Sequence, residues 1–456
     1  MVFLFKRYLN INEEGDIGVR KKSKWKIAGT LFLSLSLMLA ACSSKTDSSN
    51  EKDKGTKQEN NDNKKVTIVY ARGKDVTKGT TKIVEAFEAA HPNIHVEFKE
   101  MPSDSGQQHD TYVTQLNGKS SEIDVFDMDV IWPAEFAQAD YVLPLDRFIQ
   151  QDGIDLGTYN QGALAASQFN GKQWALPKFI DAGLLYYRTD LVSKDEVPKT
   201  WDDLLKMAKE KKGKGGTKFG YVFQAKQYEG LVCNAIEFVA SYGGQFINEK
   251  NEVVVNSPET IKGLKKLVEV ANSSVVPGNV NTFTEIESDQ AFIEGQTAFL
   301  RNWPYEFASA NDKDKSKIVG KVGIAPLPAG DKGSAAALGG WQAGINKYSK
   351  HPKEAWEFLK FMAGPEGQKL DAIYGGHAPT ITSLYSDPDV VKANPTFGDK
   401  GFQDGLNAAV PRPVAANYQE ISDIIQIEVS KAIAKQETVE QAVKNMEAQM
   451  KEKLKK

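Results

Sequence analysis

Apolar residues recur along the chain at two spacings, which predict strands that alternate with helices. A β-branched run at residues 66–71 predicts a strand. Residues 80–90 predict a helix, because Ile83, Val84 and Phe87 fall on one helical face. The same reasoning predicts strands at 94–98, 123–126, 184–187 and 219–223, and helices at 112–116, 201–210, 230–242, 258–272 and 421–454. This alternation is typical of an α/β fold with a mostly parallel sheet.

Two proline-containing segments break the alternation. Residues 174–181 (WALPKFID) and 322–328 (VGIAPLP) are extended apolar runs in which proline disfavours a helix. A length of 456 residues already implies more than one domain. We therefore interpret both segments as hinge strands that cross between two lobes.

The N-terminal segment has the layout of an export signal. A basic cluster at residues 20–26 precedes an apolar run at 27–39, and two alanines precede Cys42. The run is shorter than the roughly 20 apolar residues that span a bilayer. The LAAC sequence ending at Cys42 resembles the lipobox of bacterial lipoproteins, which implies lipidation of this thiol. We expect residues 1–41 to be the signal peptide and the mature protein to be anchored on the extracytoplasmic face of the cell membrane. A conventional signal peptide with a chance cysteine is the alternative.

Residues 1–18 do not fit such a signal, because they place three acidic residues before the basic cluster. We expect translation to begin at Val19, which a GUG start codon could encode. A peptide spanning residues 8–19 in the unprocessed precursor would contradict this hypothesis.

A polar segment follows the lipidation site. Residues 43–65 contain no large apolar side chain, so we expect Cys42 and this segment to form a disordered linker between anchor and folded body. With Cys42 lipidated, Cys233 is the single remaining cysteine and cannot form an intramolecular disulfide. We expect Cys233 to be a buried structural thiol.

Charge and motifs exclude several function classes. The net charge of −3 makes nucleic acid an unsuitable partner. His91 and His95 have helical spacing, but Pro92 breaks the helix that would align them. The sequence contains no HExxH, no phosphate-binding GxxxxGK[ST] and no paired cysteines. We expect neither a metal nor a cofactor.

Seven segments carry a resemblance to a known family. They are 119–136, 174–191, 225–233, 299–307, 320–330, 334–349 and 407–426. Together they resemble the family 1 extracellular solute-binding proteins of carbohydrate ABC importers, most closely the trehalose/maltose-binding proteins. The resemblance covers roughly residues 66–450.

The resemblance implies a two-lobed α/β periplasmic-binding-protein fold with a ligand cleft between the lobes. Lobe 1 is expected at 66–177 plus 326–366, and lobe 2 at 178–325 plus 367–456. The implied function is the capture of a disaccharide or oligosaccharide by hinge closure and its delivery to the transmembrane subunits of the permease. Trehalose, maltose, sucrose and maltodextrins all remain possible ligands. We expect a monomer that is not an enzyme.

The resemblance also implies a set of sugar-binding residues: Asp129, Phe179, Asp181, Trp303, Tyr305, Gly340, Trp341 and Arg412. Aromatic rings can cover the apolar faces of a sugar, and charged groups form the stronger hydrogen bonds to its hydroxyls. Each residue also has a structural alternative. Trp303 and Trp341 could be core aromatics, Asp181 could cap a turn or brace the hinge, and Arg412 could form a structural ion pair.

Three features of lobe 1 differ from close relatives and bear on which sugar is bound. Gln107, Gln108 and His109 occupy a region in which relatives carry arginines. The loop 72–77 lacks a glutamate that relatives present to the sugar. Asp127 replaces an apolar residue.

Two alternative functions remain open at this point. Asp129 and Asp181 in one cleft could be the carboxylate pair of a glycan hydrolase. A sugar-sensing lipoprotein without a transport role would share both the fold and the site.

Overall fold

The computed structural model describes residues 65–248, 250, 252–413 and 417–454. The predictions for Val19, the signal peptide and Cys42 lie outside this range, as does nearly all of the predicted linker. Among the described residues, no helix is long and apolar enough to cross a membrane.

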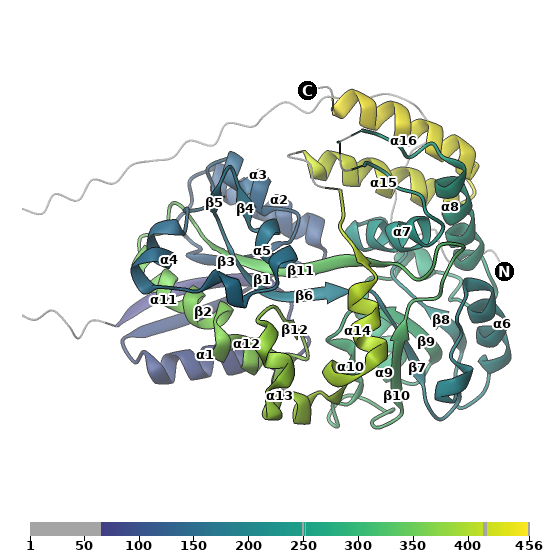
Figure 1. The fold of residues 1–456 in the computed structure, drawn as a ribbon, viewed down its shortest axis with the longest axis horizontal. Helices are drawn as coiled ribbons and strands as arrows, with labels where there is room; N and C mark the ends of the chain where they lie inside the picture. The colour runs from purple at the N-terminus through teal and green to yellow at the C-terminus, as the bar shows by residue number, and fades with distance from the viewer. Residues whose placement is uncertain (1–64, 249, 251, 414–416, 455–456) are drawn as a thin grey trace, which may run out of the picture. The chain divides into compact units, whose positions relative to one another are not determined.

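The described strands form two main sheets and one short hairpin (Figure 1). The larger sheet has the order β12-β6-β11-β3-β1-β2, and β13 pairs with β11. Its strands are β1 (Val66–Gly73), β2 (Ile94–Met101), β3 (Val125–Asp129), β6 (Leu176–Ala182), β11 (Ala336–Ile345), β12 (Ala378–Pro379) and β13 (Ala409–Val410). The smaller sheet, β10-β7-β9-β8, contains β7 (Leu184–Arg188), β8 (Phe219–Val222), β9 (Thr297–Asn302) and β10 (Val322–Pro326). The hairpin pairs β4 (Gln168–Phe169) with β5 (Lys172–Gln173).

Helices surround both sheets. Those before β6 are α1 (Gly79–Ala90), α2 (Ser105–Asn117), α3 (Pro133–Gln138), α4 (Asp146–Asp152) and α5 (Gln161–Ala166). Those between β7 and β11 are α6 (Trp201–Lys211), α7 (Glu229–Ser241), α8 (Pro258–Ala271), α9 (Glu285–Ile293) and α10 (Glu306–Ala310). Those after β11 are α11 (Pro352–Ala363), α12 (Pro365–Leu370), α13 (Pro388–Ala393), α14 (Lys400–Asn407), α15 (Tyr418–Ile433) and α16 (Val439–Lys453). Short 3₁₀ turns and a π-helical turn at Asp371–Gly375 complete the chain.

The α/β prediction is confirmed, but the expectation of a mostly parallel sheet is wrong. In the larger sheet β1 is parallel to β2 and β3, whereas β11 is antiparallel to both β3 and β6. The smaller sheet is also mixed. Strand and helix periodicity does not encode strand direction, which depends on the path that the chain takes between sheets.

Alternating burial explains why the larger sheet lies between helices. Ile68 and Tyr70 of β1 belong to a core cluster with residues of α1 and α11. Val69 and Ala71 pack into another cluster with residues of α2 and α3. Successive strand residues point to opposite faces, so one apolar strand serves both cores.

The C-terminal segment forms two helices where one continuous helical pattern was predicted. Lys435 has a left-handed φ of 59° after the end of α15. The side chain of Thr438 then caps the first turn of α16 by accepting a hydrogen bond from Gln441. The turn allows the two helices to pack against each other, as they do in Figure 1.

The chain crosses between the sheets at the two predicted segments. It leaves the larger sheet at the end of β6 and enters the smaller sheet at β7, with Gly183 between them. It returns after β10 to form β11. We refer to the part built on the larger sheet as lobe 1 and the part built on the smaller sheet as lobe 2. The predicted boundaries at 177/178 and 325/326 fall inside β6 and β10, so the exact division stays a prediction.

Candidate functional site

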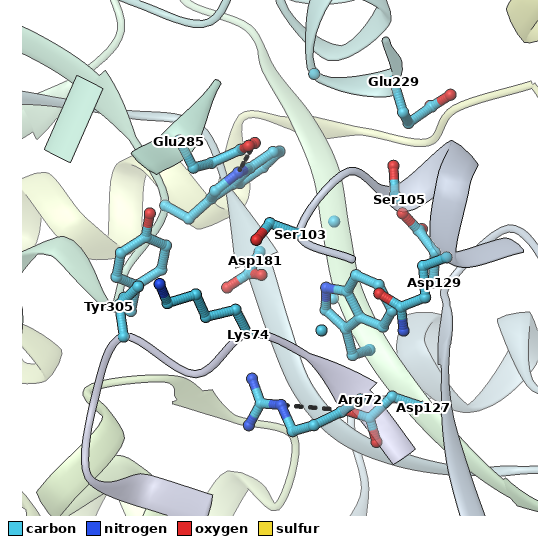
Figure 2. Close-up of a pocket in the computed structure, with 18 of the residues that line it drawn as sticks. Arg72, Lys74, Ser103, Ser105, Asp127, Asp129, Asp181, Glu229, Glu285 and Tyr305 are labelled. Carbon is cyan, nitrogen blue, oxygen red and sulfur yellow. Dashed lines mark hydrogen bonds and ion pairs between the residues drawn. The ribbon is translucent and has the colours of Figure 1, made fainter. Parts of the chain in front are cut away.

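A pocket lies between the loops of the two sheets. The space between its lining residues, including part that is open to solvent, is about 1110 Å³. Figure 2 shows side chains from both lobes that point into it. All eight predicted site residues line this pocket: Asp129, Phe179, Asp181, Trp303, Tyr305, Gly340, Trp341 and Arg412.

Strand register brings the lobe 1 residues together. Trp341 of β11 pairs with Asp129 at the end of β3 on one side and with Phe179 of β6 on the other. Asp181 is in register with Gly339. Three adjacent strands therefore place residues that are far apart in sequence in neighbouring positions on one sheet.

Arg412 is held by carboxylates from two elements. Its Nη1 lies 3.1 Å from Oδ2 of Asp129 and 3.0 Å from Oε1 of Glu229, and its Nη2 also contacts Asp129. Asp129 ends β3 and Glu229 begins α7, so the guanidinium joins the two lobes. Burial raises the pKa of the Glu229 carboxyl, and the adjacent Arg412 opposes this rise. In this structure Arg412 therefore forms ion pairs, as the structural alternative from the sequence analysis predicted.

Asp181 has a very different environment. It is 6% exposed, and its Oδ1 has no hydrogen-bond partner among the described residues. Burial raises the pKa of Asp181 to about 7. Gly339 leaves space beside this carboxyl, because a β-carbon there would lie 3.1 Å from the Asp181 Cβ. A ligand hydroxyl could supply the hydrogen bond that the protein does not.

The aromatic residues are braced by neighbours. Trp303 donates its indole N–H to Glu285 at 3.1 Å, and the Arg301 guanidinium lies 3.8 Å from its ring centre. Trp341 packs edge-on against Trp132 at 5.5 Å. Trp303, Tyr305 and Trp341 are only partly buried, so each retains ring surface that a ligand can cover.

Phe179 is less available than the other rings. It is 3% exposed and stacks on His377 at a centroid distance of 4.1 Å. Burial by itself would lower the pKa of His377, but the Asp371 carboxylate, 2.9 Å away, raises it above the usual value. We expect Phe179 to shape the floor of the pocket more than to stack on a ligand.

Similarity to known proteins identifies the family of this chain. Residues 71–369 match the bacterial extracellular solute-binding protein family. A probable ABC transporter-binding protein of Deinococcus radiodurans is 37% identical over 367 residues, which cover 78% of this chain and 86% of that protein. The chain belongs to this solute-binding protein family.

Other relatives of this solute-binding protein include sugar-binding members. The maltose-bound structure of MalE3 from T. maritima shares 39% identity and a TM-score of 0.79, with 85% of this chain and 99% of that chain covered. A maltotriose-binding protein of Pyrococcus abyssi is 25% identical over 68% of this chain and 64% of that protein. The resemblance inferred from sequence segments and the two-lobed fold are thus both confirmed.

Several pocket residues of the solute-binding protein were missed by sequence reasoning. Lys74, Glu229, Glu285 and His377 all line the pocket. In Figure 2 Lys74 points toward Tyr305, and it forms no hydrogen bond or ion pair with a described residue. Glu229 lies in one of the quoted family segments, which was a signal for its position but not for its contacts with Arg412.

The three departures from close relatives have separate structural outcomes. Gln108 is buried, lines the pocket and donates to the hydroxyl of Tyr112 at 3.0 Å. His109 is not among the residues that line the pocket, and its Nε2 lies 2.9 Å from Oε1 of Glu135. Asp127 accepts from Lys178 at 2.7 Å and from the Tyr70 hydroxyl at 2.8 Å, so it is largely satisfied by the protein.

The charged loop 72–77 is also well organised. Nη1 of Arg72 donates to the Thr80 hydroxyl at 2.6 Å, and Asp75 accepts from Thr77 and Thr80. Lys74 projects from this ordered loop. Because its ammonium has no partner among the described residues, Lys74 is available to contact a ligand in the pocket.

Proposed function

We propose that this solute-binding protein serves a sugar ABC importer and binds a disaccharide or short oligosaccharide of the maltose or trehalose type. One observation carries the proposal: the pocket combines partly exposed Trp303 and Trp341 with the unpartnered carboxyl of Asp181. A sugar presents apolar ring faces and a rim of hydroxyls, and these residues complement both.

The proposed contacts divide between the two lobes. Trp341 and Asp181 belong to lobe 1, whereas Trp303 and Tyr305 follow β9 in lobe 2. We propose that Asp181 accepts a sugar hydroxyl and that Lys74 donates to a sugar oxygen. Gly340 lets the ligand approach the strand, and Asp129, held by Arg412, presents an oriented carboxylate. Because both lobes contribute, a bound sugar favours the closed arrangement by its greater affinity for that state.

We also propose that lipidated Cys42 anchors the protein on the outer face of the cell membrane. Confinement there would keep it close to the transmembrane permease subunits to which it delivers the sugar. We expect it to act as a monomer.

Calorimetric titration of the purified chain with maltose, maltotriose, trehalose and sucrose tests the proposal. Affinity in the micromolar range corresponds to about −8 kcal/mol of binding free energy. Binding of one or more of these sugars would support the proposal. Folded protein that binds none of them would overturn the assignment to this sugar group.

The hydrolase alternative gains some support from the raised pKa of Asp181, since a neutral carboxyl can act as a general acid. Asp129 argues against it, because both of its oxygens contact the Arg412 guanidinium, which makes the carboxylate a weaker nucleophile while still allowing it to accept hydrogen bonds. We expect chromatography of the sugars after prolonged incubation to show no cleavage. Glucose that is released from maltose by the wild type but not by Asp181→Asn would favour hydrolysis instead.

The purely sensory alternative shares this site. Sugar uptake by cells that lack the protein distinguishes it, because uptake should fall if the protein serves an importer and stay unchanged if it is only a sensor.

A further inference from the structure

An ion pair joins the two lobes at the edge of the pocket. Nζ of Lys226 lies 2.9 Å from Oδ2 of Asp104. Asp104 precedes α2 in lobe 1, and Lys226 lies between β8 and α7 in lobe 2. The pair is therefore made only when these two elements lie against each other.

The chain neighbours of both residues line the pocket. Asp104 stands between Ser103 and Ser105, which are both labelled at the pocket in Figure 2. Two residues after Lys226, the Tyr228 ring lies 5.8 Å from the Lys226 ammonium and also lines the pocket. The ion pair thus connects two segments of the pocket wall without lining the pocket itself.

Asp104 also caps helix α2, and it uses one carboxylate oxygen for the cap and the other for the ion pair. Oδ1 accepts a hydrogen bond from the backbone N–H of Gln107 at 3.2 Å and caps α2. Oδ2 contacts Lys226. Asparagine is as good a helix cap as aspartate, so Asp104→Asn can remove the charge and keep the cap.

The more deeply buried ion pairs of Arg412 with Asp129 and Glu229 also join the lobes, but all three residues line the pocket itself. Lys78 lies 3.3 Å from Asp314, but these side chains are 56% and 80% exposed. The side chains of Lys226 and Asp104 are 36% and 14% exposed. Water screens the Lys226–Asp104 pair less, so this pair has the greater capacity to stabilise a closed arrangement.

We propose that Lys226 and Asp104 form a latch that holds the lobes closed over a bound sugar and slows its release. They are positioning residues, because they act through the pocket wall and not on the ligand. The proposal rests on the proposed function. Maltose carries no charge, so a salt dependence of its release reports ion pairs of the protein that break on opening.

Stopped-flow tryptophan fluorescence can measure maltose release from the wild type and from Lys226→Met, Lys226→Arg and Asp104→Asn. Lys262→Met is the matched control, because Lys262 forms an ion pair with Asp331 away from the pocket. Each rate is measured at about 0.01 M and about 1 M salt, between which the Debye length falls from roughly 30 Å to 3 Å.

We expect Lys226→Met and Asp104→Asn to release maltose about twofold to fivefold faster than the wild type at low salt, as for a partly exposed ion pair. Combining the two changes should add little, since both remove one interaction. High salt should accelerate release from the wild type more than from either variant. Lys226→Arg should restore slow release, and Lys262→Met should resemble the wild type.

Equal release rates and equal salt responses in the wild type and Lys226→Met would overturn the latch. If the wild type binds another of the four sugars in place of maltose, the release of that sugar is measured instead. If it binds none of them, the proposed ligand group fails, and hydrogen exchange of the ligand-free protein still tests the contact. We then expect faster exchange at residues 103–108 in Lys226→Met than in Lys262→Met. Identical exchange in these two variants would overturn the latch independently of the sugar.

Discussion

Asp181 and Arg412 face the same pocket but differ in how far the protein satisfies them. Arg412 already contacts two carboxylates, whereas Oδ1 of Asp181 has no partner among the described residues. A buried polar group without a partner costs more than one that is hydrogen-bonded. We therefore expect Asp181 to respond to the ligand and to pH, and Arg412 to maintain the shape of the site.

The raised pKa of Asp181 predicts a pH-dependent stability. In the unfolded chain this carboxyl ionises near its ordinary pKa of 3.8, whereas burial raises the pKa in the folded protein to about 7. Ionisation of the buried carboxyl therefore destabilises the folded protein. This loss of stability is absent below about pH 4, grows between about pH 4 and pH 7, and is constant above pH 7. Asp181→Asn stays neutral, so it should raise the melting temperature of the ligand-free protein more at pH 8 than at pH 4. The same change in melting temperature at both pH values would contradict the assignment.

Trp341 offers the most direct test of a stacking contact. Trp341→Ala should weaken binding of the sugar identified by calorimetry by about 2 kcal/mol, roughly thirtyfold, as for other buried tryptophan anchors. Trp341→Phe keeps an aromatic face and should retain much of the affinity. Both variants should be shown to be folded by their melting curves. Unchanged affinity in Trp341→Ala would assign this ring to the core.

At the scale of elements, β11 organises the site, because it pairs with both β3 and β6. A register shift between Trp341 and Gln342 marks an irregularity in its pairing with β6. Gly340 lies beside this shift with a φ of 128°, and a β-carbon there would lie 2.5 Å from the carbonyl oxygen of Phe179. The strand can therefore accept only glycine at this position without moving its neighbour.

Gly340→Ala should destabilise the protein by about 3 kcal/mol or more, because it combines backbone strain with a backbone clash. Gly278→Ala is the control, since a β-carbon at Gly278 would meet no atom within 4 Å. Urea unfolding of both variants measures the difference. Equal stability of the two variants would show that β11 adjusts at little cost.

At the scale of the whole molecule, the proposed function depends on two connections: the contacts that join the lobes and the proposed lipid anchor that would join the protein to the membrane. Arg412 and the proposed latch both lie between elements of different lobes. The proposed anchor, Cys42, lies far from these contacts in sequence. Anchoring and sugar binding should therefore be separable by mutation.

Cys42→Ser should prevent lipidation and move the protein from the membrane fraction to the culture medium. Its sugar affinity, measured on the released protein, should equal that of the wild type. Cys233→Ser is the control, because Cys233 is a buried residue of α7 and should not affect anchoring. If Cys42→Ser stayed on the membrane at the wild-type level, this would contradict the proposal that Cys42 is lipidated.

The sequence by itself determined the α/β character, several of the strands and helices, and eight of the residues that meet in the pocket. Local periodicity is sufficient for elements such as α1 and β1, and the family segments contain all eight predicted site residues. Only the tertiary structure decided the mixed strand directions, the partners of Arg412 and the isolation of Asp181. These features depend on contacts between distant residues, such as Arg412 and Asp129, which are 283 positions apart. Hydrogen bonding and burial are set by such contacts, and no local pattern of residues encodes them.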